Sequence, residues 1–235
     1  MVLLVVASRN RHKVEEIQSI LGPEFECSIL SELPGAPELI EDADTFAGNA
    51  TRKALQLAEW LIRTPESGVQ SPKFQSLVLA DDSGLEVDAL NGAPGVHSAR
   101  FAAKQIGSPG NSPDKANNAR LLQLLQDVPP ERRTARFRCV LALTPLLKAA
   151  PESSSQVCYA NEMELQTELF EGVCEGCIAL APAGNGGFGY DPLFIPAGHR
   201  QSFAELGEDV KNRLSHRSKA LDKLRRRLSR AAQDA

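Results

Sequence analysis

A short apolar run that ends in two adjacent acids places the strongest restriction on how this chain folds. Leu77, Val78 and Leu79 have the pattern of a short buried strand. Asp81 and Asp82 stand at its end, and buried carboxylates are costly unless they are paired or bind a cation. The acids therefore indicate a metal site or a proton-transfer site, although Asp-Asp-Ser-Gly is also the sequence of an ordinary solvated turn.

Residues 80–101 as a whole have the features of a site for an anion bridged by a metal. Asn91-Gly92 and Pro94-Gly95 mark tight turns after the acids. A cationic segment, His97 to Arg100, follows these turns. Acids, glycine-rich turns and bases so close together in the sequence are typical of such a site.

The composition allows one large or two small domains, because 235 residues suffice to bury a proper core. The net charge of −4 argues against a general nucleic-acid coat protein. We expect no membrane span, since no run of 18 apolar residues is present. The N-terminal apolar run is short and follows no basic region, so we interpret it as a strand and not as a signal peptide.

The five cysteines do not indicate a disulfide framework, because their number is odd and their positions are scattered. Cys174 and Cys177 have CxxC spacing, but no second pair accompanies them, which disfavours a structural zinc. No thioredoxin-like pattern surrounds the pair, which disfavours redox activity. We therefore expect a protein of the reducing cytoplasm.

The N-terminal region predicts a strand, a polar turn and a helix. Leu3 to Ala7 is the strand, Ser8 to Lys13 the turn, and Val14, Ile17 and Leu21 have helical spacing before the stop at Gly22-Pro23. A helix N-terminus with a lysine is a natural anion site. Ser8 or Asn10 as a simple helix cap is the alternative, and both roles can hold together.

A second strand, Phe25 to Leu30, precedes an acidic patch and a long helix. The helix is predicted to start at Thr45 and has one apolar face. Asn49 and Lys53 stand four residues apart, so their polar ends can point to one place. A solvated surface charge is the alternative for Lys53. The apolar face consists of Phe46, Ala50, Ala54, Leu57 and Leu61.

The second half predicts a helix and several strands. The helix runs from Asp114 to the stop at Pro129-Pro130, and Thr134 to Leu143 alternates as a half-buried strand. Two shorter strands are expected around 157–163 and 165–173. Residues 64–76 and 148–155 are interpreted as loops without assigned chemistry.

Residues 183–196 form a glycine-rich stretch that suits a planar ligand. Phe188 and Tyr190 offer ring faces to a base, and Asp191 offers an acceptor. The lysine of a phosphate-binding P-loop is missing. Further along, His216 and Arg217 are placed to reach phosphates and a purine edge, ahead of a basic C-terminal helix.

Together these motifs resemble the inosine triphosphate pyrophosphatase family, which hydrolyses deaminated purine nucleoside triphosphates. Four blocks carry the resemblance, in the family's order and over nearly the whole chain. They are Ser8-x-Asn10-x-x-Lys13; Thr45-Phe46-x-x-Asn49-Ala50-x-x-Lys53-Ala54; Ala80 to Leu85 with Gly92 to Arg100; and Gly187 to Pro192 with Phe203 to Leu206 and Lys211 to Arg217.

The resemblance implies a bilobed α/β fold over residues 1–235, a single domain with two lobes. A long, twisted mixed β-sheet is flanked by helices, and the active-site cleft lies between the lobes. Members are typically Mg²⁺-dependent homodimers that convert ITP, dITP and XTP to the monophosphate and pyrophosphate. No nucleic-acid or membrane partner is implied.

The resemblance also implies roles for individual residues. Asp82 matches the family's catalytic base and metal ligand, with Asp81 beside it. Ser83 matches a substrate contact, and the triphosphate is expected at Ser8, Asn10, Lys13 and Lys53. The base is expected to be enclosed and read by Phe188, Gly189, Tyr190, Asp191, Lys211, His216 and Arg217.

One departure concerns the metal. The family usually has a metal-binding Glu before the Thr-Phe pair, often followed by a Gly, whereas this chain has Glu41-Asp42-Ala43-Asp44. Glu41 is the best candidate, with Asp42 and Asp44 as alternatives. We expect Mg²⁺ at Glu41 and Asp82 and a water activated by Asp82 or Asp81. The rival hypotheses are a pyrophosphatase for another base, such as a modified pyrimidine, and a non-catalytic nucleotide- or RNA-binding protein.

Overall fold

A computed structural model of the chain describes residues 2–64, 75–103, 107, 110–146, 164 and 166–233. The expected loop at 148–155, the expected strand at 157–163 and most of the loop at 64–76 lie outside the described residues. None of the helices in the described ranges combines the length and hydropathy that crossing a bilayer requires.

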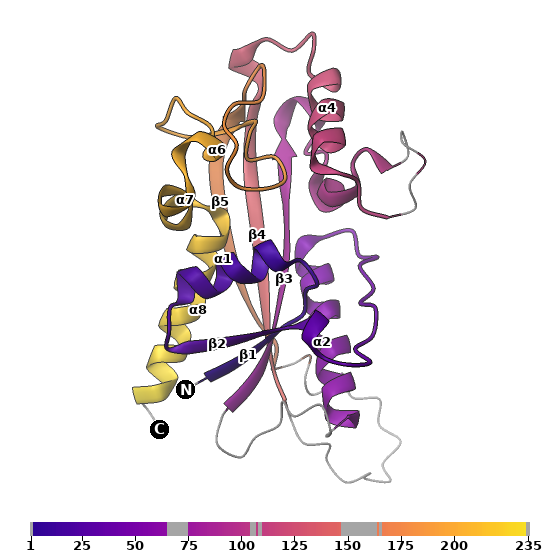
Figure 1. Cartoon of the computed structure of the whole chain (residues 1–235), viewed down its shortest axis with the longest axis vertical. Helices are drawn as coiled ribbons and strands as arrows, with labels where there is room; N and C mark the ends of the chain where they lie inside the picture. Colours follow the sequence, from indigo (N-terminus) through magenta and orange to yellow (C-terminus); the bar gives the residue numbers. More distant parts are fainter. Residues whose placement is uncertain are drawn as a thin grey trace. The chain divides into compact units, whose positions relative to one another are not determined.

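The described residues form a six-stranded mixed sheet with helices around it, which confirms the expected α/β class (Figure 1). The strand order is β2-β1-β3-β4-β5-β6, in which β1 is parallel to β2 and β3 while β5 and β6 are antiparallel. The strands are β1 (Val2–Val6), β2 (Phe25–Ile29), β3 (Gln75–Val87), β4 (Thr134–Pro145), β5 (Glu168–Ile178) and β6 (Phe194–Pro196). The α-helices are α1 (Arg11–Leu21), α2 (Phe46–Arg63), α4 (Asp114–Leu124), α6 (Phe203–Leu206), α7 (Glu208–Leu214) and α8 (His216–Gln233).

The chain consists of two compact units, and one of the boundaries between them falls between Asp82 and Ser83. Unit 1 comprises Met1–Asp82, Val140–Phe170 and Leu224–Ala235, and unit 2 comprises Ser83–Cys139 and Glu171–Lys223. Each unit is therefore built from segments that are distant in the sequence.

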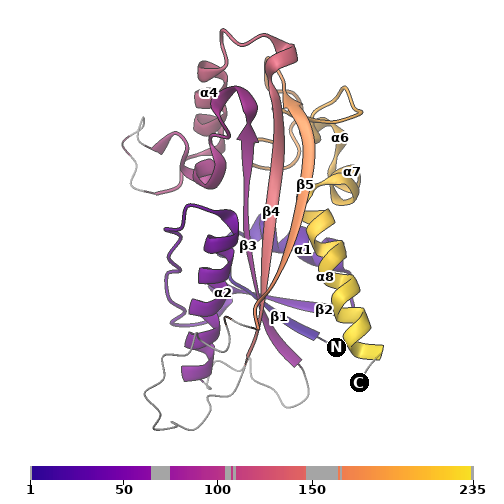
Figure 2. The same cartoon turned by 180° about the vertical axis from the view of Figure 1, so that it is seen from behind.

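In unit 1, the helices that follow β1 and β2 lie on opposite faces of the parallel strands. The chain moves from β1 outward to β2 and then back past β1 to β3. Crossovers between parallel strands are right-handed, so a reversal of direction places α1 and α2 on opposite faces, as Figures 1 and 2 show. In open α/β sheets, ligands bind where the direction reverses, at the carboxyl ends of the two adjacent strands.

Unit 2 has a core of aliphatic and aromatic side chains from its strands, α4 and α6. Phe137 lies 4.5 Å from Phe194 between ring centroids, and the Phe137 ring stacks on His216 at 4.8 Å. Gly172 of β5 is needed for close packing, because a Cβ there would clash with the carbonyl of His216. The first turn of α8 therefore lies directly against β5.

Three expected boundaries were wrong. β3 continues to Val87, so the acids lie within the strand and not at its end. The helix from Asp114 ends at Leu124, before the prolines, and Arg133 donates to the carbonyl of Leu125 at 2.6 Å. The strand expected at 165–173 is β5, which runs from Glu168 to Ile178 and pairs with β6 over its last residues.

Candidate functional site

The acid pair lies where β1 ends and β3 continues. Val6, the last residue of β1, pairs with Leu79, and the amide of Ala7 donates to the Leu79 carbonyl at 2.8 Å. Asp81 lies two residues beyond Leu79 and is 1% exposed, and Asp82 is 6% exposed. Because β1 stops at this level, polar groups from its following turn can approach the acids.

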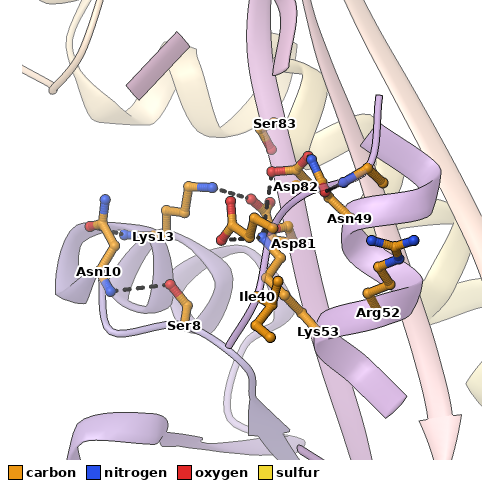
Figure 3. Close-up of polar contacts among 12 residues, drawn as sticks. Ser8, Asn10, Lys13, Ile40, Asn49, Arg52, Lys53, Asp81, Asp82 and Ser83 are labelled. Carbon is orange, nitrogen blue, oxygen red and sulfur yellow. Dashed lines mark hydrogen bonds and ion pairs between the residues drawn. The ribbon is translucent and has the colours of Figure 1, made fainter. Parts of the chain in front are cut away.

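The turn after β1 brings Lys13 to Asp81. The Lys13 Nζ lies 2.6 Å from Asp81 Oδ1 (Figure 3). Asn10 is the N-cap of α1 and accepts from the Lys13 amide at 3.2 Å, and Ser8 Oγ accepts from the Asn10 amide at 3.1 Å. Asn10 thus has the capping role expected as an alternative, whereas Ser8 bonds the cap residue, and binding of a triphosphate by the two residues stays a prediction.

Asn49 and Lys53 of α2 reach the acids from the other helix. Asn49 Nδ2 donates to Asp82 Oδ2 at 3.1 Å. Lys53 Nζ donates to the Asp81 carbonyl at 2.7 Å and lies 3.4 Å from Asp82 Oδ1. At 4% exposure, Lys53 is not the solvated surface charge considered as its alternative role.

The segment 40–43, which we call the acidic segment, runs antiparallel to α2, and each of its residues contacts one helix side chain. Gln56 binds both the amide and the carbonyl of Ile40, at 3.1 and 3.3 Å. The three other contacts are Lys53 with Glu41 at 3.0 Å, Arg52 with Asp42, and Asn49 Oδ1 with the Ala43 amide at 2.9 Å.

This arrangement separates the candidate metal-binding acids. Glu41 shares the ammonium of Lys53 with Asp82, whereas Asp42 pairs with Arg52, whose side chain is 51% exposed. The Cβ of Ala43 fits against α2 because Gly48 stands opposite: a Cβ on Gly48 would lie 2.8 Å from that of Ala43. Of Glu41 and Asp42, Glu41 is thus the acid that shares a partner with Asp82.

Burial dominates the electrostatics of Asp82. It raises the pKa of the Asp82 carboxyl, and the nearby charge of Glu41 raises it further. Lys53, Lys13 and the hydrogen bond from Asn49 lower the pKa but do not cancel the effect of burial. A bound cation would therefore stabilise the ionised carboxylate.

The residues of this site fit a magnesium ion in donor type. Glu41 and Asp82 are carboxylates, the ligands that Mg²⁺ prefers, and Mg²⁺ takes its remaining ligands from water and phosphate. Within the described residues, no group of three or more His, Cys, Asp or Glu side chains is arranged to hold a metal. Glu41 and Asp82 are two carboxylates, a set that would suit an ion that brings ligands from a phosphate-bearing substrate.

A second polar cluster lies in unit 2, around the glycine-rich stretch. Lys211 Nζ lies 2.8 Å from Asp191 Oδ2, and the amide of Phe188 donates to the same oxygen at 2.9 Å. The Lys211 ammonium also lies 4.3 Å from the centroid of the Phe188 ring. Gly187 is required here, because it has a positive φ of 71° and a Cβ would clash with the Asp191 carboxylate.

Arg217 connects this cluster to the residue that follows the acids. Its guanidinium lies 5.8 Å from the centroid of the Phe188 ring and donates to Ser83 Oγ at 3.4 Å, and the residue is 1% exposed. The structure thus brings Ser83, Phe188, Asp191, Lys211 and Arg217 together.

Tyr190 and His216, also expected near a base, are core residues. Tyr190 is 4% exposed, and its hydroxyl donates to the Ser98 carbonyl at 2.9 Å. Burial raises the pKa of Tyr190. His216 is 5% exposed and stacks on Phe137. Tyr190 therefore anchors the turn through its hydroxyl and does not present a free ring face.

The sequence analysis gave no role to two residues of α4 that bind this turn. Asp114 accepts from the Gly189 amide at 2.7 Å, and Asn118 donates to the Gly189 carbonyl at 3.0 Å. An Asp and an Asn four residues apart on a helix are common, so no signal in the sequence marked them. Their partner is 71 to 75 residues away.

Comparison with known proteins gives consistent matches along the chain. Residues 4–227 match the model of the Ham1 family. A protein of Desulforamulus reducens named dITP/XTP pyrophosphatase is 46% identical over 228 residues, 97% of this chain and 96% of that protein. A protein of the same name from Shouchella clausii is 42% identical over 222 residues, 94% of each chain.

Solved structures match as well. The HAM1 protein of Coxiella burnetii has a TM-score of 0.73 at 34% identity, covering 98% of this chain and all (100%) of its own. The Ham1 protein of Staphylococcus aureus has a TM-score of 0.70 at 32% identity, covering 97% of this chain and 98% of its own.

Proposed function

The chain belongs to the Ham1 family, and we propose that it hydrolyses deaminated purine nucleoside triphosphates (ITP, dITP and XTP) to the monophosphate and pyrophosphate. The observation that carries the proposal is the buried acid pair held between Lys13 and Lys53. The name of the relatives that are 42–46% identical to the chain supports the same reaction class. Removal of deaminated purines from the nucleotide pool fits a cytoplasmic location.

We assign the triphosphate to the cationic side of the acid site. Lys13 and Lys53 provide ammonium groups, and the N-terminus of α1 provides backbone amides near Ser8 and Asn10. Glu41 and Asp82 would hold Mg²⁺. The bound ion would neutralise phosphate charge and polarise the phosphorus–oxygen bonds.

We assign the proton transfer to Asp82, with Asp81 as the alternative. A base is most effective when its pKa approaches the working pH, and burial raises the pKa of Asp82. Asp81 is already engaged by Lys13 at 2.6 Å, so its carboxylate is less available to a water molecule. A water molecule attacks phosphorus and gives its proton to the Asp82 carboxylate, the α–β anhydride bond breaks, and pyrophosphate leaves.

We assign base recognition to the cluster of unit 2. The Phe188 ring supplies a stacking surface, and the Arg217 guanidinium supplies donors. Hypoxanthine and xanthine have a carbonyl acceptor at the 6-position, whereas adenine has an amino donor there. A buried donor that faces another donor stays unpaired, which gives strong discrimination.

Product analysis tests the function. The purified protein is incubated with dITP and Mg²⁺, with dATP and Mg²⁺, and with dITP and EDTA. We expect deoxyinosine monophosphate and pyrophosphate, formed far faster from dITP than from dATP and not formed with EDTA. Orthophosphate with a diphosphate would refute the bond assignment.

Two further outcomes would identify the rival hypotheses. Faster turnover of a modified pyrimidine triphosphate would replace the purine assignment. Tight binding without turnover, weakened steeply by salt, would indicate a binding protein. We also propose a homodimer, which light scattering during gel filtration checks by a mass of twice 25.4 kDa.

A further inference from the structure

We propose that Asp114 and Asn118 of α4 are positioning residues that set base selectivity by fixing the Gly189 peptide. This inference rests on the proposed function, because it assumes that the turn of residues 188–191 encloses the base. Neither residue contacts the base in this proposal. They act through the turn.

The two side chains bind both polar groups of one residue. Asp114 Oδ2 accepts from the Gly189 amide at 2.7 Å, and Asn118 Nδ2 donates to the Gly189 carbonyl at 3.0 Å. Residues four apart on a helix project from the same face, so α4 presents an acceptor and a donor as a rigid pair. Gly189 has a positive φ of 63°, and a Cβ added to it would meet no atoms within 4 Å, so steric contact does not hold it in place.

Every residue of the turn is anchored, but by different groups. The Phe188 amide is bound by Asp191, which Lys211 holds in turn, and the Tyr190 hydroxyl is bound to Ser98. Phe188 is the residue before Gly189 in the sequence, and its ring lies beside the Lys211 ammonium. Release of Gly189 would therefore remove one of the constraints on Phe188, and the ring would be held less firmly relative to a bound base.

The state of Asn118 argues against a role in packing alone. Asn118 is 7% exposed, and within the described part of the chain its Oδ1 is buried without a hydrogen-bond partner. A buried unsatisfied acceptor is costly, and an apolar side chain would avoid the cost. What the amide adds here is the Nδ2 donor to Gly189.

Isosteric variants separate the two roles. Asn118→Asp replaces the donor with an oxygen that faces the Gly189 carbonyl, and Asn118→Leu removes the donor without adding charge. Asp114→Asn keeps an oxygen that can accept from the Gly189 amide, so it is the mild variant. Lys115→Ala changes an exposed residue of the same helix and is the matched control.

The measurements are kcat and KM for dITP and dATP, the melting temperature, and hydrogen exchange of a peptide spanning 188–191. We expect Asn118→Asp and Asn118→Leu to lower the dITP-to-dATP ratio of kcat/KM by about two- to tenfold, the range that loss of one neutral hydrogen bond can produce. In both Asn118 variants, KM for dITP should rise more than kcat falls, and hydrogen exchange of residues 188–191 should become faster. The dITP-to-dATP ratio of Asp114→Asn should lie between that of the Asn118 variants and that of Lys115→Ala, which should equal the wild-type ratio.

An unchanged ratio together with a lowered melting temperature would overturn the proposal, because it would leave the two residues a structural role only. If the wild-type protein did not hydrolyse dITP, the proposed function would fail by itself. The role in selectivity would then be tested with the dissociation constants of the protein for deoxyinosine and deoxyadenosine monophosphates. The proposal would be overturned if the ratio of these two constants were equal in wild type and variants, or if the wild type bound neither nucleotide.

Discussion

Asn49→Leu tests whether one buried amide connects the acidic segment to the acid pair. Asn49 is 0% exposed, accepts from the Ala43 amide at 2.9 Å and donates to Asp82 Oδ2 at 3.1 Å. Leucine has a similar volume and high helix propensity, so neither a cavity nor a weaker α2 explains a loss. The variant removes two hydrogen bonds and little else.

The expected loss follows from the two bonds. A hydrogen bond to a charged group contributes about 1.5–3 kcal/mol and a neutral one about 1 kcal/mol, so Asn49→Leu should lower the free energy of unfolding by about 2.5–4 kcal/mol. The pKa of Asp82 should rise further, because the bond from Asn49 lowers it in the wild type. The acid limb of the pH–rate profile should therefore move to higher pH.

Gln56→Leu is the matched control, on the same helix face. It removes the two hydrogen bonds to Ile40, at 3.1 and 3.3 Å, and one within α2 to the Arg52 carbonyl at 3.1 Å, but leaves the contacts of Asp82 in place. Urea unfolding and pH–rate profiles with dITP are measured for both variants. Equal stability losses, or an acid limb that moves in Gln56→Leu and not in Asn49→Leu, would refute the link between Asn49 and Asp82.

The other predictions concern single residues and the metal. Asp82→Asn should lower kcat by about 10²–10⁴-fold. Burial raises the pKa of Asp82 in the folded protein, so ionisation of this carboxyl lowers wild-type stability as the pH rises above the unfolded-state pKa. Without metal, the melting temperature of Asp82→Asn at pH 7 should therefore be at least that of wild type. Arg217→Ala should reduce the preference for dITP over dATP, measured as kcat/KM. Gly172→Ala should lower the melting temperature markedly, since its Cβ clashes with the His216 backbone. Mg²⁺ should raise the melting temperature of the wild type more than that of Glu41→Gln. Calorimetry of Mg²⁺ binding to the two proteins checks this expectation independently.

Much of the fold could be predicted because it depends on local patterns. The apolar run of β1, the stop at Gly22 and the N-cap at Thr45 each act over a few residues, and the Thr45 side chain does accept from the Gly48 amide at 3.0 Å. The extent of β3 could not be predicted, because the strand continues past Asp81 and Asp82, where the sequence becomes polar. Pairing with neighbouring strands overrides local composition there.

Residue patterns alone indicated the acid pair and the convergence of Asn49 and Lys53, whereas the individual roles at the site rest on the family resemblance. Glu41, Asp42 and Asp44 have the same chemistry and adjacent positions, so the sequence did not decide between them. Between Glu41 and Asp42, the contacts with α2 favour Glu41 as the proposed ligand, because Lys53 lies 3.0 Å from Glu41 whereas Arg52 pairs with Asp42. The hydrogen bonds from α4 to Gly189 join residues more than 70 positions apart, so no local sequence pattern predicts them.

The strand order explains why the site needs two adjacent acids. Successive side chains of a strand point to opposite faces of the sheet, and the reversal at β1 places α1 on one face and α2 on the other. Asp81 therefore meets Lys13 of α1, and Asp82 meets Asn49 and Lys53 of α2. One acid alone would reach one helix. The Asp-Asp pair joins both faces at one level of β3, and Asp82, the acid on the α2 face, shares Lys53 with Glu41, which supports our assignment of the metal and the proton transfer to Asp82.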